Sequence, residues 1–159
     1  MTGKIGYEWP MEIALIHPEI PGNTGNIGRS CVATNTRLHL VRPLGFSIED
    51  RWLKRAGLDY WQHIDLQVHE KLEDFLDAID PSKMILFSRF ATKNFWEAPY
   101  DASSILVFGS ETQGLPHLMH QNYQEQLYVV PVPGKVRSLN LATCAGIALY
   151  EGIRQISSL

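Results

Sequence analysis

The sequence predicts a single α/β domain in which a mostly parallel sheet is flanked by helices. Short, nearly continuous apolar runs alternate along the chain with amphipathic segments of helical period, which is the order expected of a parallel sheet with helical crossovers. The length of 159 residues suits one domain. Hydrophobic residues make up 45% and charged residues 19% of the chain, a composition typical of globular rather than disordered proteins.

The expected strands are the apolar, β-rich runs. Pro18 and Pro43 bound the first two of them. The runs cover residues 12–17, 37–42, 83–90, 104–108 and 126–131, with a weaker one at 64–68. Their continuous apolar character predicts burial on both faces of the sheet.

The expected helices lie between these runs, at residues 26–35, 50–56, 70–79, 117–121 and 140–156. Gly146 and Gly152 fall inside the last of them, where glycine costs roughly 1 kcal/mol relative to alanine. This cost indicates close packing at the two glycines, either against a second subunit or within the same chain.

Several function classes are disfavoured by composition. No apolar run approaches the roughly 20 residues of a membrane helix, and the N-terminus lacks the apolar stretch of a signal peptide, so we expect a cytoplasmic protein without a membrane segment. Cys31 and Cys144 are too few for a disulfide framework. The six histidines have no metal-ligand spacing, so no metal is expected.

The net charge of −3 argues against nucleic acid, but the basic residues are unevenly distributed. Acids are missing between Glu19 and Glu49, and again from residue 126 to 150. Basic side chains in or near these stretches could form a phosphate-binding face if they meet in space; scattered surface charge is the alternative. The candidates are Arg37, Arg42, Arg51, Lys54, Arg55, Lys135 and Arg137.

Three loops of unusual composition follow expected strands, at the edge where open parallel sheets bind ligands. The first, residues 18–29, contains Asn23 and Arg29. Because a cation near a helix start gains nothing from the helix dipole, Arg29 is interpreted as a phosphate or carboxylate ligand. Asn23 is a candidate polar site residue or, alternatively, a helix cap.

The second loop, residues 108–116, contains Gly109 and Glu111, and the third, residues 130–140, contains Ser138 and Asn140. Glu111 could also cap a helix or lie on the surface, and Ser138 could be an N-cap. Neither a Gly-x-Gly-x-x-Gly sequence after a strand nor a Walker loop is present, which disfavours a conventional dinucleotide or ATP site.

Taken together, the three loops resemble the signature motifs of the SPOUT superfamily of RNA methyltransferases. The matching motifs are Asn23-x5-Arg29, Phe108-Gly109-x-Glu111-x2-Gly114-Leu115-Pro116, and Pro131-x7-Leu139-Asn140 with Tyr150-Glu151. Residues 18–21 and 55–60 resemble the tRNA (cytidine/uridine-34-2′-O)-methyltransferase subfamily. The ordered set carries the resemblance, since no single motif is specific.

The resemblance implies a SPOUT methyltransferase domain at residues 11–159, with a deep C-terminal trefoil knot, preceded by an extension at residues 1–10. It implies a homodimer in which each active site draws on both subunits. The implied reaction transfers a methyl group from S-adenosylmethionine to the ribose 2′-hydroxyl of the tRNA wobble nucleotide, cytidine or modified uridine at position 34, in the anticodon stem-loop.

The resemblance also implies roles for individual residues. The cofactor contacts are Phe87, Gly109, Val130, Ser138 and Leu139, although family members usually have a smaller aliphatic residue in place of Phe87. The catalytic set is Arg29, Asn23, Glu111, Ser138 and Asn140. Arg29 is expected to contact the phosphate beside the target ribose and to assist deprotonation, Asn23 to hold Arg29 or the ribose, and the other three to shape the pocket.

Three alternatives remain from the sequence alone. The chain could be a SPOUT methyltransferase of another tRNA position or of rRNA, a non-catalytic RNA-binding protein that keeps the knotted scaffold, or an ordinary nucleotide-binding α/β domain. The intact polar residues of the three loops disfavour the second alternative.

Overall fold

The computed structural model describes residues 11–49 and 58–157. Six strands form one sheet in the order β3-β2-β1-β5-β4-β6, and every neighbouring pair is parallel. The strands are β1 (Glu12–Ile16), β2 (Arg37–Val41), β3 (Leu66–His69), β4 (Met84–Phe87), β5 (Ile105–Phe108) and β6 (Leu127–Tyr128). The predicted parallel α/β sheet is therefore confirmed.

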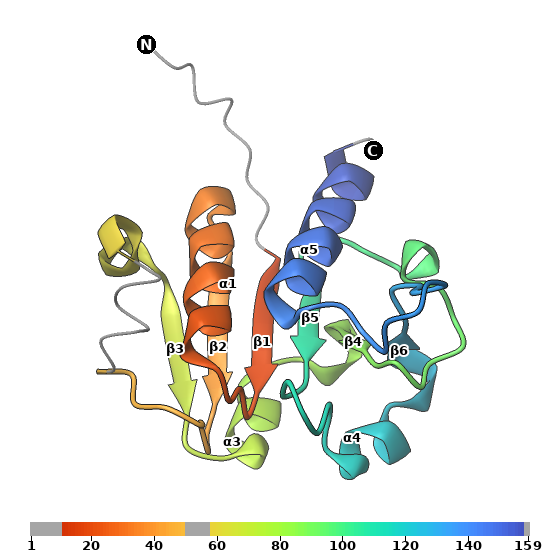
Figure 1. Ribbon diagram of the computed structural model, residues 1–159, viewed down its shortest axis with the longest axis horizontal. Helices are drawn as coiled ribbons and strands as arrows, with labels where there is room; N and C mark the ends of the chain where they lie inside the picture. Colours follow the sequence, from red (N-terminus) through yellow and green to blue (C-terminus); the bar gives the residue numbers. More distant parts are fainter. Residues whose placement is uncertain (1–10, 50–57, 158–159) are drawn as a thin grey trace.

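Helices cover both faces of the sheet (Figure 1). The long helices α1 (Pro21–Thr34) and α5 (Leu141–Ser157) lie on one face, where Ile27 and Leu149 join the larger apolar core. The short helices α3 (Leu72–Ala78) and α4 (His117–Asn122) lie on the other, where Phe75 and Met119 join a second core. Short 3₁₀ turns at Leu58–His63, Pro81–Lys83, Phe95–Glu97 and Gln124–Gln126 complete the described elements.

Helix α1 begins at Pro21, five residues before the predicted start at residue 26. Proline is favoured in the first helical turn, because its fixed φ suits a helix and its missing N–H is not needed there. Asn23 consequently lies inside the helix, and the residue at the N-cap position is Ile20, whose side chain makes no capping hydrogen bond. The prediction of a loop up to residue 25 was wrong. The predicted helix at residues 50–56 lies outside the described residues.

The two glycines of α5 differ in their surroundings. A Cβ on Gly152 would lie 3.0 Å from Met11 Sδ and 3.0 Å from Tyr100 Cδ1, so this glycine packs within its own chain. A Cβ on Gly146 would meet no described atom within 4 Å. Both cysteines are free, and burial raises the pKa of the Cys31 thiol to about 12.

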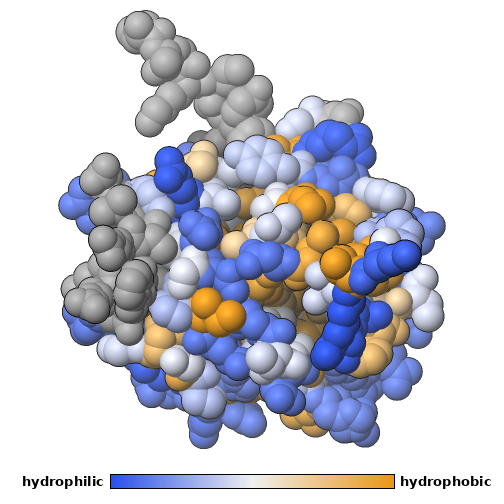
Figure 2. Space-filling model, in the orientation of Figure 1, coloured by the Kyte–Doolittle hydropathy of each residue, from blue (hydrophilic) through white to orange (hydrophobic). Residues whose placement is uncertain are grey.

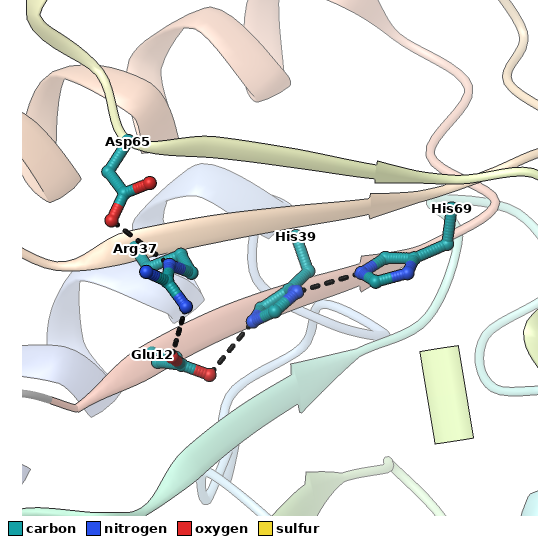
Figure 3. A network of polar contacts seen from close by, with 5 residues as sticks. All are labelled: Glu12, Arg37, His39, Asp65 and His69. Carbon is teal, nitrogen blue, oxygen red and sulfur yellow. Dashed lines mark hydrogen bonds and ion pairs between the residues drawn. The ribbon is translucent and has the colours of Figure 1, made fainter. Parts of the chain in front are cut away.

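A polar network crosses β1, β2 and β3 on the α3 side of the sheet (Figure 3). His39, 3% exposed, contacts Glu12 Oε2 through Nε2 at 2.8 Å and His69 Nε2 through Nδ1 at 2.9 Å. An ionised carboxylate only accepts hydrogen bonds, so Nε2 of His39 carries a proton. Arg37 extends the network through ion pairs to Glu12 at 3.4 Å and to Asp65 at 3.0 Å.

This network makes the free energy of unfolding depend on pH. Burial, and secondly repulsion from His39, hold the pKa of His69 below its ordinary value, while Asp74 opposes the shift. The unfolded chain therefore binds a proton at higher pH than the folded chain, and stability is lost as pH falls below about 6.5. We expect the urea midpoint to fall between pH 7.5 and 5.5, and His69→Gln to reduce that fall. The matched change His63→Gln, at an exposed position, should leave it as in the wild type; equal slopes in all three proteins would contradict this prediction.

Candidate functional site

Glu111 joins the loop after β5 to the start of α1. Its Oε1 accepts a hydrogen bond from the Glu19 backbone N–H at 2.8 Å. Its Oε2 accepts one from the Ile20 N–H at 2.7 Å and another from Asn23 Nδ2 at 3.2 Å. The first turn of α1 contains no acidic residue of its own. A carboxylate from a distant loop thus occupies the positive end of this helix, where an anion is stabilised by the helix dipole and by free N–H groups.

Asn23 extends this connection to the third loop. Its Oδ1 accepts a hydrogen bond from Asn140 Nδ2 at 3.0 Å, and Asn23 is 7% exposed. Asn140 also starts α5, because its Oδ1 accepts from the Thr143 N–H at 3.2 Å. We call Glu111, Asn23 and Asn140 the three-loop hub, since their side chains link all three loops at the carboxyl edge of the sheet.

The hub bears on two of the sequence interpretations. Asn23 Nδ2 donates to Glu111 and its Oδ1 accepts from Asn140, so in this structure the amide contacts the other two loops and not the Arg29 of its own chain. The described geometry also gives the α5 capping role to Asn140 rather than to Ser138, which is exposed in the loop just before the helix. Asn23 and Asn140 therefore act on the positions of the loops.

Glu19 and Thr112 join the same two loops a second time. Here the accepting carboxylate belongs to the first loop and the hydrogen-bond donors belong to the second. Glu19 Oε1 accepts hydrogen bonds from Thr112 Oγ1 at 2.6 Å and from the Thr112 N–H at 3.2 Å. The Thr112 hydroxyl is the main reason why the pKa of Glu19 lies below its ordinary value, with smaller contributions from Ser110 and the Thr112 backbone. Sequence reasoning missed both residues as site residues; the only available signal was the acid within the Pro18–Pro21 segment.

Gly109 permits the tight fold of the second loop. The Ser110 N–H donates to the Gly114 carbonyl at 3.1 Å, and the Gly114 N–H to the Ser110 carbonyl at 3.0 Å. This pairing brings the returning chain so near that a Cβ on Gly109 would lie 2.0 Å from Gly114 C and 2.1 Å from Leu115 N. Gly114 itself has a φ of +68°, which side-chain-bearing residues rarely adopt.

Three of the five residues assigned to the cofactor from sequence, Phe87, Gly109 and Val130, lie at or just beyond the carboxyl ends of three adjacent strands, β4, β5 and β6. Phe87 is paired in register with Phe108 of β5 and with Tyr128 of β6. Gly109 follows Phe108 directly, and Val130 lies two residues beyond Tyr128. The Phe87 ring is buried and stacked on Phe108, with centroids 4.6 Å apart, so the ring is part of the larger apolar core. Ser138 and Leu139 precede α5.

Arg29 lies apart from the hub. It follows the start of α1 by eight residues, more than two turns, rather than the single turn expected. It lies six positions after Asn23, which places the two side chains about 120° apart around the helix axis. Arg29 is exposed, and its guanidinium carbon lies 5.1 Å from the centroid of the Tyr60 ring. Nothing in this arrangement brings Arg29 to its own chain's hub.

The seven basic residues assigned to RNA do not form one surface in the described part of the chain. Arg37 lies at the amino end of β2, opposite the loops, in ion pairs with Glu12 and Asp65. Arg42 lies at the carboxyl end and pairs with Glu70 at 3.3 Å. Lys135 and Arg137 are exposed in the third loop. The remaining three, Arg51, Lys54 and Arg55, lie outside the described residues.

Within residues 11–49 and 58–157, no three or more His, Cys, Asp or Glu side chains gather in a way that could hold a metal ion. No helix in that same part of the chain is long and apolar enough to cross a membrane.

Comparisons with known proteins show what this chain is similar to. A model of the SpoU rRNA Methylase family matches residues 10–150. A Synechocystis sp. protein, provisionally named as a tRNA (cytidine(34)-2′-O)-methyltransferase, is 49% identical over 152 residues, 94% of this chain and 99% of that protein.

Two solved structures are similar over nearly the whole chain. One, described as "Structural insights into the 2-OH methylation of C/U34 on tRNA", has a TM-score of 0.89 and 40% identity, covering 96% of this chain and 100% of its own. An AdoMet-bound rRNA methyltransferase from Sinorhizobium meliloti has a TM-score of 0.82 and 25% identity, covering 94% of this chain and 57% of its own.

Proposed function

The chain belongs to the SpoU rRNA methylase family, and from this premise we propose that it transfers a methyl group from S-adenosylmethionine to the ribose 2′-hydroxyl of nucleotide 34 of tRNA. The three-loop hub is the structural observation that carries the proposal, because it holds together the loops expected to bind cofactor and ribose. The relatives that share nearly the full length of the chain favour the wobble nucleotide over another tRNA position or rRNA. A tRNA substrate implies a cytoplasmic protein.

The described residues fit S-adenosylmethionine at the ends of β5, β4 and β6. At Gly109 the backbone of the second loop passes too close for any side chain. Val130 is a partly buried apolar side chain that packs against the larger core. Backbone groups at Phe87 and Gly109, apolar contacts from Val130 and Leu139, and the Ser138 hydroxyl would hold the cofactor. When bound, it supplies a methyl group on a sulfonium, whose transfer neutralises a positive charge.

The protein's own residues orient the acceptor. A ribose hydroxyl is a poor nucleophile at neutral pH, so alignment with the methyl carbon supplies much of the acceleration. A guanidinium stays protonated in proteins, so Arg29 contributes by binding the phosphate beside the target ribose and fixing the position of the hydroxyl. Glu111, Asn23 and Asn140 keep the loops at the spacing that this alignment needs.

The proposal includes a C-terminal trefoil knot. The chain leaves β6 at one edge of the sheet and returns to α5, which packs against α1 and β5. On the way, Val129 exchanges backbone hydrogen bonds with residues 93–95: its N–H donates to the Lys93 carbonyl at 2.8 Å and its carbonyl accepts from the Phe95 N–H at 3.0 Å. This pairing of the residue just before the third loop with the loop after β4 supports a threaded backbone.

The proposal also includes a homodimer in which Arg29 serves the partner's site. Arg29 lies on a different side of α1 from the hub of its own chain. Figure 2 shows hydrophobic surface gathered over α5 and the segment beside it, on the face formed by α1 and α5. Val136, Ile147 and Tyr150 are exposed, and a Cβ on Gly146 would meet no described atom within 4 Å.

Charges on this face should separate the dimer. Ile147→Glu with Tyr150→Glu places two carboxylates where apolar side chains would be buried, which is unfavourable without partners. We expect analytical ultracentrifugation to give a monomer at micromolar concentration, with methyl transfer lost. Leu118→Glu, at a similarly exposed position of α4 on the opposite face, is the matched control and should remain dimeric and active. A double variant that stays dimeric would exclude this face as the interface.

The reaction itself is tested by incubating the protein with methyl-labelled S-adenosylmethionine and total tRNA, then mapping ribose methylation by nuclease digestion and mass spectrometry. We expect label at the 2′-oxygen of nucleotide 34. Label at another nucleotide, or in rRNA, would favour the sister enzymes, and cofactor binding without transfer to any RNA would favour a non-catalytic RNA-binding protein.

A further inference from the structure

A pocket that no catalytic role explains lies beside the three-loop hub. Loops that follow four strands line it, together with α4, and its volume is ≈ 900 Å³, within the usual range of ligand pockets. Glu19 and Ser110 in its wall belong to the two loops that Glu111 joins. The pocket is therefore next to the proposed reaction centre, but it extends toward α4 rather than toward β6.

An aromatic platform forms one side of this pocket. Phe90 lines it and is 69% exposed. The Arg89 guanidinium lies over the Phe90 ring, 4.5 Å from its centroid. His120 meets the same ring edge-on at 6.2 Å between centroids, and Ser88 Oγ holds His120 Nε2 at 2.8 Å. The ring is thus fixed in place by two neighbours while most of its area stays accessible.

The remaining lining suits a flat heterocycle with polar edges. Leu44 and Leu115 provide apolar surface, and Gln113 and His117 provide hydrogen-bonding groups. Of the described residues that line the pocket, Glu19 alone is acidic, and its Oε1 accepts two hydrogen bonds from Thr112. Arg89 adds positive charge at the rim, which complements a phosphate attached to the heterocycle.

We propose that this pocket binds an unpaired nucleobase of the substrate RNA, stacked on Phe90, from a nucleotide other than the one that is methylated. The inference rests on the proposed function, which brings a single-stranded tRNA loop to the neighbouring hub. Bases in such loops are unstacked and are commonly recognised by stacking on aromatic side chains and on arginine. The methylated nucleotide must reach the methyl group at the ends of β5, β4 and β6, and none of the residues assigned to the cofactor lines the pocket, so the pocket holds a neighbour.

The test combines Phe90→Ala with an anticodon stem-loop in which one loop nucleotide at a time is made abasic. We expect Phe90→Ala to weaken binding of the intact stem-loop by about tenfold, the effect of one stacked base, with unchanged affinity for S-adenosylmethionine and little change in kcat at saturating RNA. In the wild type, one abasic position other than nucleotide 34 should weaken binding similarly, and in Phe90→Ala the same abasic position should cost nothing further. Such non-additivity identifies the pair in contact. Trp96→Ala, an exposed aromatic outside the pocket, is the control and should leave RNA binding unchanged.

Three results would overturn the inference. Unchanged RNA affinity in Phe90→Ala would exclude stacking on this ring, and additive losses at every abasic position would show that Phe90 contacts no base. An equal loss of S-adenosylmethionine affinity would make the pocket a part of the cofactor site. If the wild type methylates the stem-loop while one of these results is obtained, only the pocket assignment fails; if it transfers no methyl group, the proposed function fails.

Discussion

Replacement of Arg29 by alanine should lower single-turnover methyl transfer by about 100-fold or more, the usual effect of removing one charged group that acts in the transition state. Arg29 lies on an exposed part of α1, away from the strand ends where the cofactor is expected. Its loss should therefore leave the affinity for S-adenosylmethionine within a few-fold of the wild type. The measurements are quenched-flow transfer to tRNA and isothermal titration with the cofactor.

Arg29→Lys is the informative control. A lysine keeps the charge but not the planar fork that binds a phosphate through two hydrogen bonds, so its rate should fall between those of the wild type and the alanine variant. If Arg29→Ala instead loses cofactor affinity in proportion to rate, Arg29 supports the fold or the interface and does not contact the RNA phosphate.

Three of the six strands could be predicted closely because their signal is local, whereas the run predicted at residues 83–90 extends three residues beyond the end of β4 at Phe87. The first two and the fifth strand were predicted to within one residue at each end, since continuous apolar runs bounded by proline or by polar turns allow few other structures. The start of α1 was not predictable in this way. Pro21, Gly22 and Gly25 are typical of a loop, and the carboxylate that occupies the helix start comes from Glu111, about 90 residues away along the chain.

The two outer strands were predicted less well because edge strands are specified by their neighbours. The last predicted strand spanned residues 126–131, but only Leu127 and Tyr128 pair with β4. β4 ends at Phe87, so β6 has no further partner there. Val129, the residue after β6, instead makes an isolated bridge to Asn94. The strand predicted at residues 64–68 lies at Leu66–His69, where Gln67 is exposed at the sheet edge.

The three loops could be predicted as neighbours, but the contacts of their individual residues could not. The glycines and polar residues after the strands identified the three loops, and hydrogen bonds join Asn23, Glu111 and Asn140. Which residue holds which loop depends on contacts across separations of 88 and 117 residues, and local spacing does not encode such contacts. Phe90 and His120, which line the proposed base pocket, could not be found from sequence for the same reason, since they come together through the sheet and α4.

Gly109→Ala should abolish cofactor binding and, with it, methyl transfer. The new methyl group would lie 2.0 Å from the backbone of Gly114 and 2.1 Å from that of Leu115. Backbone atoms cannot turn aside as a flexible side chain can, so the second loop must move away from the strand ends. We expect isothermal titration to detect no S-adenosylmethionine binding, with circular dichroism close to that of the wild type.

Gly134→Ala is the matched control, because a Cβ there meets no described atom within 4 Å although Gly134 also lies in a site loop; it should bind the cofactor normally. Should Gly109→Ala not fold, Gly114→Ala gives a milder disturbance, since its Cβ has space and only the φ of +68° is strained, at a cost of roughly 1–2 kcal/mol. Normal cofactor affinity in Gly109→Ala would show that the cofactor does not depend on the second loop.

Mixing the Arg29→Ala and Gly109→Ala variants tests whether each site draws on both subunits. In a mixed dimer, the Arg29→Ala chain keeps an intact second loop, and the Gly109→Ala chain keeps Arg29. If Arg29 serves the partner's site, one of the two sites in that dimer is complete. Random exchange makes half of the dimers mixed, so an equimolar mixture should regain about a quarter of the wild-type rate from two inactive proteins. If Arg29 serves its own chain, no complete site forms and the mixture stays inactive.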